Sequence, residues 1–498
     1  MNQTRHEAFC SRHYAALAVG VLLFAAFNLI FRLGREFVTE WDEALYAVSA
    51  TELVKSGDWI GVTFLGKLDY YNTKPPLNVW LIALAFKAFG PGLVSLRLPS
   101  VAAAWLTVAV LQYWARRAFG PAVSLLASLV LATTFGFLHV HSARSGNTDA
   151  LFTLLVLLTV LTLWEEERWR WHRVWLGPLL AATFLLRGFA VLMPLTIVVL
   201  VALRRSRWHS KWIPPSGIAL LLFLAPVTMW AVARYRLDEW LFFERMLHYD
   251  FLARSLDTLE QHAGGPTYYL NILIKHHAEW IVAGIASLVV VPTSWSRLRA
   301  WIARALADQA RTPLVVAWAV STLLIPTLMR TKLPWYLNTF YPLFALVVAQ
   351  LLLRAYSYAS RAPGARARLV ALSLVVALAW AASEVKLFWY SVHFRDLSRS
   401  AQGLLLDQPE GLSGRVVFRD LFDRSAMFVT GLVGAEFRHI ESADDFLREA
   451  SPGDFLLTSD DLHHRGLTLV RSNARHRLYL RIESDGSRLP SAPAWPKE

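Results

Sequence analysis

The sequence has little charge and almost no cysteine. Asp, Glu, Lys and Arg make up 17% of its 498 residues, against roughly 25% in soluble domains. The single cysteine, Cys10, excludes an internal disulfide. No Gly-rich phosphate loop, Cys-x-x-Cys pair or His-Glu-x-x-His motif occurs. These absences argue against a P-loop nucleotide enzyme, a dithiol redox protein and a zinc protease of that type.

Hydrophobic residues, by contrast, are abundant. They make up 55% of the chain, which includes 21 Trp, and the mean hydropathy is +0.38. Apolar runs of about 20 residues recur, which predicts membrane-spanning helices rather than one large soluble core. The predicted spans are 14–31, 97–114, 121–138, 150–164, 174–187, 188–203, 213–234, 278–295, 313–329, 337–353 and 369–388. The run 14–31 is longer than the apolar core of a signal peptide, so we expect an uncleaved first span.

The net charge of +13 fits either nucleic-acid binding or cytoplasmic loops that follow the positive-inside rule. Basic residues cluster in short breaks between apolar runs, and no basic stripe with interleaved aromatic residues is present. This distribution excludes nucleic acid as the expected partner and favours the membrane topology.

The short apolar segment 77–89 decides that topology. If it lies in the membrane plane, the basic clusters at 116–117, 168–173, 204–211, 297–311 and 354–368 share one face with the N-terminus. If it crosses, that asymmetry is lost. We therefore predict about 11 transmembrane helices, a cytoplasmic N-terminus and an in-plane juxtamembrane helix in a multi-pass bacterial inner-membrane protein.

Two long loops, 32–76 and 235–277, then face the periplasm. The composition changes after residue 388, where short apolar strands are expected at 415–418, 455–458, 467–470 and 477–480. Ser442 precedes a helix start that resembles a capping box. We predict a transmembrane module over 1–388 and a small periplasmic α/β domain over 389–498.

The first long loop contains the acidic pair Asp42-Glu43 and the cation Lys74, followed by two prolines. Asp42 is either a solvated loop carboxylate or a general base that activates a hydroxyl group. Lys74 is either an interfacial lysine with its ammonium in the headgroup region or a phosphate ligand. Spacing alone does not separate these alternatives.

Three further charged residues lie between predicted spans on the same outer face. Asp149 is either an N-cap of the next helix or a second, substrate-orienting carboxylate. Arg187 is expected to contact either lipid headgroups or a phosphate. Lys332 precedes Trp335 and Tyr336, which fit an aromatic belt, and its own charge suits a phosphate oxyanion.

The histidines His248, His262, His276 and His277 match no metal signature, so no metal site is predicted, although a divalent cation is left open. The acids and cations on one face suit a phosphate leaving group and a hydroxyl nucleophile. Cations that stabilise a departing phosphate can replace a general acid.

At these residues the chain resembles the lipid-dependent GT-C glycosyltransferases, and more narrowly the superfamily of protein O-mannosyltransferases and lipid A aminoarabinose transferases. The resemblance runs from residue 42 to residue 336. Its motifs are Asp42-Glu43 with Tyr46, Gly57-Asp58-Trp59, Lys74-Pro75-Pro76-Leu77 with Trp80, Phe89-Gly90, Arg97-Leu98-Pro99-Ser100, Thr148-Asp149, Phe242-Phe243, His262 with Gly265-Pro266 and Tyr268-Tyr269, and Lys332-Leu333-Pro334 with Tyr336.

The resemblance implies a GT-C fold, a polyprenyl-phosphate sugar donor and transfer with inversion. It implies Asp42 as base or acceptor-orienting acid, with Glu43 beside it and Asp149 as a supporting acid. It places Lys74, Arg187 and Lys332 near the donor phosphate. Candidate substrate contacts are Tyr46, Tyr71, Tyr336 and His262.

The chain departs from the family pattern at three positions. Leu45 stands where Arg is frequent, and Thr73 where Glu is frequent, which weakens the case for a metal. Arg187-Gly188-Phe189 replaces Lys-Gly-Pro, which keeps the charge and allows a bidentate anion contact.

We therefore predict a periplasm-facing glycosyltransferase whose acceptor is lipid A, an envelope glycan or a protein. The alternatives are a transporter or flippase of lipid-linked sugars and a non-enzymatic assembly partner that binds through its tail. A transporter would place ionisable groups near the bilayer midplane and often has internal repeats, neither of which is visible here.

Overall fold

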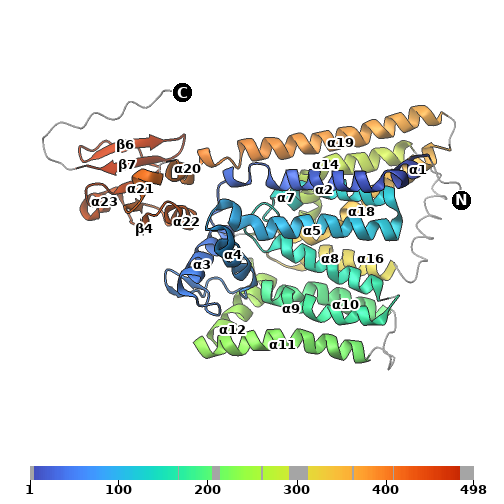
Figure 1. Ribbon diagram of the computed structural model, residues 1–498, viewed down its shortest axis with the longest axis horizontal. Coiled ribbons are helices and arrows are strands. Elements are labelled where there is room, and N and C mark those ends of the chain that lie inside the picture. Colours follow the sequence, from blue (N-terminus) through green and yellow to red (C-terminus); the bar gives the residue numbers. More distant parts are fainter. Residues whose placement is uncertain are drawn as a thin grey trace. The chain divides into compact units, whose positions relative to one another are not determined.

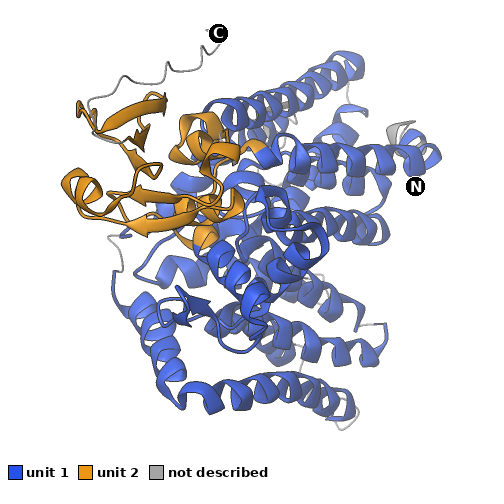
Figure 2. Ribbon diagram, turned by 60° about the vertical axis from the view of Figure 1, so that its left-hand side comes forward, with its two compact units in different colours: residues 1–34, 45–394 blue, residues 35–44, 395–498 orange. Residues whose placement is uncertain are grey.

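The computed structural model describes residues 5–482 except 167, 205–212, 259–261, 291–311, 362–363 and 408. The predicted basic breaks at 205–211 and 297–311 lie outside the described residues, as does the end of the predicted span 278–295. The chain divides into two compact units (Figure 2). Unit 1 comprises 1–34 and 45–394, and unit 2 comprises 35–44 and 395–498.

Unit 1 is a bundle of long helices that run side by side (Figure 1). Apolar side chains on most faces allow such helices to pack against one another and against lipid. The long helices are α2 (Tyr14–Ile30), α5 (Leu93–Phe119), α8 (Asp149–Glu165), α11 (Ile213–Asp238), α14 (Tyr268–Val290), α18 (Tyr341–Ala359) and α19 (Ala365–His393).

Shorter elements connect these helices. Before α8 they are α1 (Arg5–Arg12), η1 (Leu33–Arg35), α3 (Asp42–Ser56), the hairpin β1 (Thr63–Phe64) and β2 (Lys67–Leu68), α4 (Leu77–Phe89), α6 (Pro121–Ala132) and α7 (Phe135–His139). After α8 they are η2 (Arg170–Trp175), α9 (Leu176–Arg187), η3 (Gly188–Val191), α10 (Leu192–Arg204), α12 (Leu241–Arg245), η5 (Met246–Ala253), α13 (Arg254–Leu256), α16 (Thr312–Ala319), η7 (Val320–Leu324), α17 (Ile325–Leu328) and η8 (Pro334–Phe340).

Among the described residues, six helical segments are long and apolar enough to cross a membrane: Tyr14–Arg35, Leu93–Phe119, Arg170–Arg204, Ile213–Asp238, Pro334–Ala359 and Ala365–His393. The protein is a multi-pass helical membrane protein. The finer count of about 11 spans stays a prediction. The two spans predicted over 174–203 form one segment, interrupted at Gly188, whose φ of 54° favours glycine.

The predicted in-plane segment forms α4. Its 13 residues extend about 20 Å at 1.5 Å per residue, which is shorter than the ~30 Å hydrocarbon core of a bilayer. Its buried residues include Val79, Ile82 and Phe86, and it packs against α5 and α9. These features agree with a helix that does not cross, while its orientation in the membrane stays a prediction.

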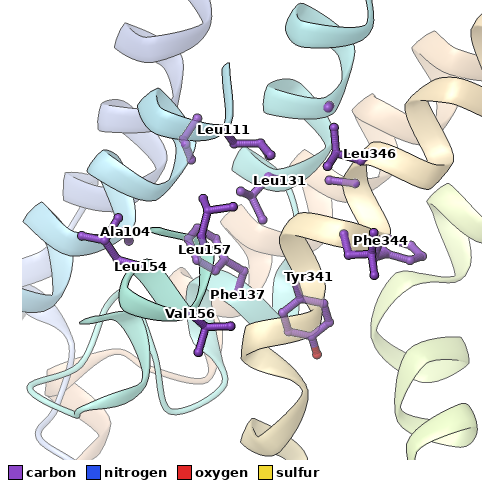
Figure 3. Close-up of a cluster of buried hydrophobic side chains, with 14 of the residues drawn as sticks. Ala104, Leu111, Leu131, Phe137, Leu154, Val156, Leu157, Tyr341, Phe344 and Leu346 are labelled. Carbon is purple, nitrogen blue, oxygen red and sulfur yellow. The ribbon is translucent and has the colours of Figure 1, made fainter. Parts of the chain in front are cut away.

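The core of unit 1 lies where α5, α6, α7, α8 and α18 meet (Figure 3). Phe137, Leu157 and Tyr341 are buried there. Gly136 allows the close approach of α7 to α18, because a Cβ at this position would lie 2.2 Å from the Tyr341 hydroxyl. Small residues serve this purpose widely in membrane helix bundles.

Unit 2 contains a five-stranded sheet of order β4-β3-β5-β7-β6. The strands are β3 (Val416–Arg419), β4 (Glu436–His439), β5 (Phe455–Thr458), β6 (Leu467–Ser472) and β7 (Arg477–Arg481). β3 pairs in parallel with β4 and β5, with Val417 opposite both Phe437 and Phe455. β7 pairs antiparallel with β5 and β6. The helices are η9 (Leu397–Arg399), α20 (Ala401–Leu406), α21 (Pro409–Leu412), α22 (Arg424–Leu432) and α23 (Ala443–Glu449).

Four strands lie at the stretches that the sequence indicates. β4 was not predicted, because it is an edge strand whose side chains are mostly exposed and whose sequence, Glu-Phe-Arg-His, contains no apolar run. The Ser442 side chain caps α23 by accepting from the Asp445 amide. The predicted boundary at 388/389 falls within α19, and the segment 35–44, expected in the membrane module, belongs to unit 2.

Within unit 2, Glu40 binds the N-terminus of α22. Its carboxylate accepts hydrogen bonds from the Arg424 amide at 2.8 Å and the Ser425 amide at 2.9 Å. Burial and a hydrogen bond with Asp423 raise the pKa of Glu40 to about 7. Asp423 in turn pairs with Arg419 at 2.9 Å. Two carboxylates that share a site titrate far apart.

This arrangement predicts a pH dependence. Because the pKa of Glu40 is higher in the folded protein, unit 2 loses stability as pH rises from about 4.5 to about 7. Glu40→Gln mimics the protonated acid, so its melting temperature should rise relative to wild type across that window and then level off. Burial lowers the pKa of His476, which produces the opposite slope. That slope is common to both proteins and cancels in the comparison.

The control is Glu436→Gln, which changes an exposed carboxylate of the same unit. Thermal unfolding in detergent at several pH values should show no pH-dependent difference for this variant. A constant offset between Glu40→Gln and wild type at every pH would contradict the assignment.

Candidate functional site

Unit 1 contains a cavity of about 200 Å³ that combines charged and apolar walls. Lys74, Arg187, Asp250, Arg254 and Ser255 supply its polar groups. Apolar walls come from Phe152, Phe189, Leu192, Met193, Ile325 and Pro326. Residues that lie far apart in the sequence therefore build one site with a polar part and a larger apolar part.

Arg187 reaches the cavity from the C-terminal end of α9. Its Nη1 lies 2.5 Å from Asp149 Oδ1, at the start of α8, and its side chain is 12% exposed. The guanidinium also lies over the rings of Phe152 and Tyr336, 5.3 and 6.0 Å from their centres. A buried arginine is costly unless it is paired, so Asp149 and the two rings hold this charge in the cavity wall.

The second oxygen of Asp149 contacts a histidine. Asp149 Oδ2 lies 2.9 Å from His141 Nδ1. His141 has a φ of 55°, which is unusual for a residue other than glycine, and its ring stacks on Trp335 with centres 4.2 Å apart and planes 12° apart. Asp149 thus joins Arg187 and His141. It does not act as the helix N-cap that the sequence left open, since Thr148 holds that position.

Lys74 enters the cavity from the turn before α4. The prolines that follow it restrict the backbone at this point. The Lys74 ammonium lies 5.4 Å from the centre of the Tyr46 ring, which is buried. This cation–π contact fixes the direction of a flexible side chain.

A third cation is held by a carboxylate. Asp250 Oδ1 lies 3.1 Å from Arg254 Nε, and Asp250 Oδ2 accepts a hydrogen bond from the Thr73 hydroxyl at 2.6 Å. Thr73 immediately precedes Lys74. One hydrogen-bonded chain therefore links the turn that contains Lys74 to Arg254.

The charges of this cavity favour an anionic ligand with an apolar part. Lys74, Arg187 and Arg254 face it, with Asp250 as the one carboxylate among the described lining residues. Guanidinium and ammonium groups bind phosphate oxygens through charge-assisted hydrogen bonds. The apolar walls can take hydrocarbon, so the cavity suits a phosphate attached to a lipid chain.

The predicted phosphate ligand Lys332 lies elsewhere. Its ammonium donates to the carbonyl oxygens of Thr327 at 2.6 Å and Met329 at 2.5 Å, at the C-terminal end of α17. Burial lowers the pKa of this ammonium. Among the described residues the cavity lining does not include Lys332. Its role as a phosphate ligand stays a prediction. In the structure its ammonium caps the C-terminal end of α17.

The two carboxylates of the acidic pair, Asp42 and Glu43, differ in burial. Glu43 is fully buried, and its carboxylate accepts from the amide and hydroxyl of Thr39 at 2.9 and 3.0 Å. Asp42 is half-buried in the first turn of α3. Glu43 therefore supports the start of α3, which leaves Asp42 as the carboxylate of the pair that solvent reaches.

The four predicted substrate contacts also differ in position. Tyr336 lines the cavity, and Tyr46 contacts Lys74. Tyr71 is 46% exposed beside Tyr249, with ring centres 6.4 Å apart. His262 is half-buried, and its carbonyl accepts from the Lys332 amide at 2.9 Å. Their roles as substrate contacts stay predictions.

Sequence reasoning missed His141, Asp250 and Arg254. The spacing of Asp250 and Arg254, one helical turn apart, was an available signal for a local ion pair. Nothing local indicated that this pair meets Thr73. Within the described residues, no group of three or more His, Cys, Asp or Glu side chains is placed to hold a metal ion.

Comparison with known proteins finds relatives of the kind that the sequence motifs indicate. The dolichyl-phosphate-mannose-protein mannosyltransferase family matches residues 73–230. The chain is 28% identical over 331 residues to an undecaprenyl phosphate-α-4-amino-4-deoxy-L-arabinose arabinosyl transferase of Pseudomonas savastanoi, and 31% identical over 326 residues to that of Pseudomonas paraeruginosa. This similarity agrees with the resemblance that the sequence motifs indicate.

These alignments cover 64% of the chain in each case, and 58% and 56% of the two relatives. The chain thus spans under two thirds of the length of the curated relatives it matches. Among solved structures, ArnT from Cupriavidus metallidurans bound to undecaprenyl phosphate has a TM-score of 0.68 at 15% identity. That match covers 95% of this chain and 99% of the other, and it shows that the two chains share a fold.

Asp149→Asn should destabilise the protein by about 3–5 kcal/mol, because it leaves the buried Arg187 guanidinium without its counter-charge. The measurement is thermal or denaturant unfolding in detergent. Asp445→Asn is the control, since it removes a pair with Arg448, whose side chain is 75% exposed, and should change stability little. Equal losses of stability in the two variants would show that the Asp149–Arg187 contact stabilises the fold no more than the Asp445–Arg448 pair does.

Proposed function

We propose that this protein is an inner-membrane glycosyltransferase that moves a sugar from a polyprenyl-phosphate donor to an acceptor in the cell envelope. The observation that carries the proposal is the cavity of unit 1, where three cations face a mainly apolar space. The names of the matched relatives, which specify an undecaprenyl-phosphate aminoarabinose donor, support the same class of substrate.

In this proposal the donor phosphate lies between Lys74, Arg187 and Arg254, and the polyprenyl chain follows the apolar wall. Negative charge grows on the phosphate as its bond to the anomeric carbon breaks. Fixed cations in a site of low dielectric stabilise that charge most where it develops. Asp149 keeps Arg187 oriented, and Tyr46 does the same for Lys74.

The acceptor hydroxyl, or a similar nucleophile, attacks the anomeric carbon from the side opposite the phosphate. Asp42 accepts the proton of the acceptor, the new glycosidic bond forms, and polyprenyl phosphate leaves with the electrons of the broken bond. The configuration of the sugar is therefore inverted. Asp42 has this role from the family resemblance, and it is the carboxylate of the acidic pair that solvent reaches.

The acceptor is a lipid in this proposal, and the resemblance to lipid A aminoarabinose transferases favours lipid A over envelope glycan or protein. We place the active site and the C-terminal unit on the periplasmic side, because the basic loops then follow the positive-inside rule. The rival function, transport of a lipid-linked sugar, would need the same cation cavity but no general base.

Lys74→Met should weaken donor binding. Loss of one charge-assisted phosphate contact costs about 1.5–3 kcal/mol, so the KM for a polyprenyl-phosphate sugar should rise by about tenfold or more. Steady-state kinetics in lipid nanodiscs would measure this change. Lys67→Met, which alters an exposed lysine of the same loop, should behave as wild type. An unchanged KM for Lys74→Met would remove Lys74 from the donor site.

Asp42→Asn should abolish transfer while donor binding is retained, since the amide cannot accept the acceptor proton. Losing a general base typically costs 10²–10⁴-fold in rate. Mass spectrometry of wild type and variant with pooled polyprenyl-phosphate sugars and envelope acceptors would detect glycosylated product and free polyprenyl phosphate. Full transfer activity of Asp42→Asn would refute Asp42 as the general base. Donor movement across liposomes without any turnover by wild type would favour the transporter.

A further inference from the structure

The segment that leads into Asp42 is held by the C-terminal tail. Residues 35–44 group with 395–498 in unit 2, although 350 residues separate the two stretches. The contact begins with Gln402 of α20, which is 4% exposed. Its amide donates to the Val38 carbonyl at 2.8 Å and accepts from the Val38 amide at 2.8 Å. One side chain thus satisfies both backbone groups of Val38.

Arg395 and Asp396 hold Glu36 and Phe37, the two residues before Val38. The Phe37 amide donates to the Arg395 carbonyl at 3.1 Å, and Arg395 Nη2 donates to the Phe37 carbonyl at 3.3 Å. The same guanidinium lies 3.5 Å from the Glu36 carboxylate and 3.8 Å from that of Glu43. Glu36 and Asp396 form an isolated β-bridge.

Thr39 and Glu40, which follow Val38, are held by the first turn of α3 and by α22, respectively. Glu40 accepts two amide hydrogen bonds at the N-terminus of α22, from Arg424 and Ser425. Thr39 donates to Glu43 and so closes the first turn of α3. Each residue from Glu36 to Glu40 therefore has a partner in the tail or at the start of α3.

These contacts have a physical consequence for a segment that forms only an isolated bridge and the first turn of a helix. Buried backbone groups must be paired somewhere, and here the tail supplies most of the partners. Without them, residues 36–41 would sample many conformations, and ordering them would cost conformational entropy. The tail thus determines where α3 begins.

We propose that the C-terminal unit is a positioning element of the enzyme, in which Gln402, Arg395 and the N-terminus of α22 hold residues 36–43 so that Asp42 stands ready to act. This inference rests on the proposed function for the role of Asp42. Gln402 and Arg395 are positioning residues, because they act through the segment and touch no substrate. In this proposal the C-terminal tail contributes to catalysis and is not a separate binding module.

The test uses the full-length protein with Gln402→Ala and, separately, Arg395→Lys, which keeps the charge but loses the forked donor geometry. We expect kcat to fall by about tenfold to a hundredfold, the range that follows from small misplacement of a reacting group. The KM for the polyprenyl-phosphate donor should stay unchanged, because the cation cavity in unit 1 is not altered. Hydrogen–deuterium exchange of the peptide that covers 35–44 should rise.

Ser442→Ala is the matched control. It removes the cap of α23 in the same unit but touches no residue of 35–44, so neither kcat nor exchange of that peptide should change. If Gln402→Ala raises exchange while kcat equals that of Ser442→Ala, positioning by the tail is overturned. If neither Gln402→Ala nor Arg395→Lys raises exchange, the tail does not hold the segment, and the inference also fails.

The outcome for wild type separates this inference from the proposed function. Absence of transfer by wild type would refute the transferase and with it the catalytic part of the inference. The exchange measurement would then still decide whether the tail holds 35–44. Transfer by wild type with full kcat in both variants would leave the transferase standing and refute the positioning role alone.

Discussion

The contact between Asp149 and Arg187 is the interaction on which the cavity depends. An arginine at the end of an apolar helix is tolerated only where an anion or water satisfies it, and Asp149 provides that anion from the start of α8. The same carboxylate holds His141, which in turn stacks on Trp335. Three chain segments that are remote in sequence are thereby joined around one buried charge.

The other cations of the cavity are restrained in a similar way. Tyr46 lies beneath Lys74, and Asp250 pairs with Arg254 while it accepts from Thr73. The carboxylate beside the turn that contains Lys74 comes from Asp250 of η5, which accepts from the Thr73 hydroxyl. This arrangement retains net positive charge in the cavity, which a phosphate ligand requires, and keeps each cation in a defined direction.

Contacts between residues remote in sequence order each unit separately. In unit 1, packing around Tyr341 and Phe137 sets the positions of α7, α8 and α18, and so of the loop that contains His141. In unit 2, hydrogen bonds from the tail order the residues before Asp42. Unit 2 also has a hydrophobic core of its own, which includes Phe418, Phe446 and Leu456.

The sequence by itself determined the membrane class, the main helices and the candidate residues Lys74, Asp149 and Arg187. Long apolar runs have few alternatives to a helix when water is absent, and charged residues beside them are costly enough to be informative. Four of the five tail strands could also be read from apolar runs, whereas the exposed edge strand β4 could not.

Only the tertiary structure decided which of these residues meet. It paired Asp149 with Arg187, gave Lys332 to the carbonyl groups of α17, and introduced His141, Asp250 and Arg254. It also assigned residues 35–44 to the tail. Local propensity and hydropathy describe neighbours along the chain. The geometry of the folded chain selects the partners of these groups, whether they are 38 residues apart, as Asp149 and Arg187 are, or 364 apart, as Val38 and Gln402 are.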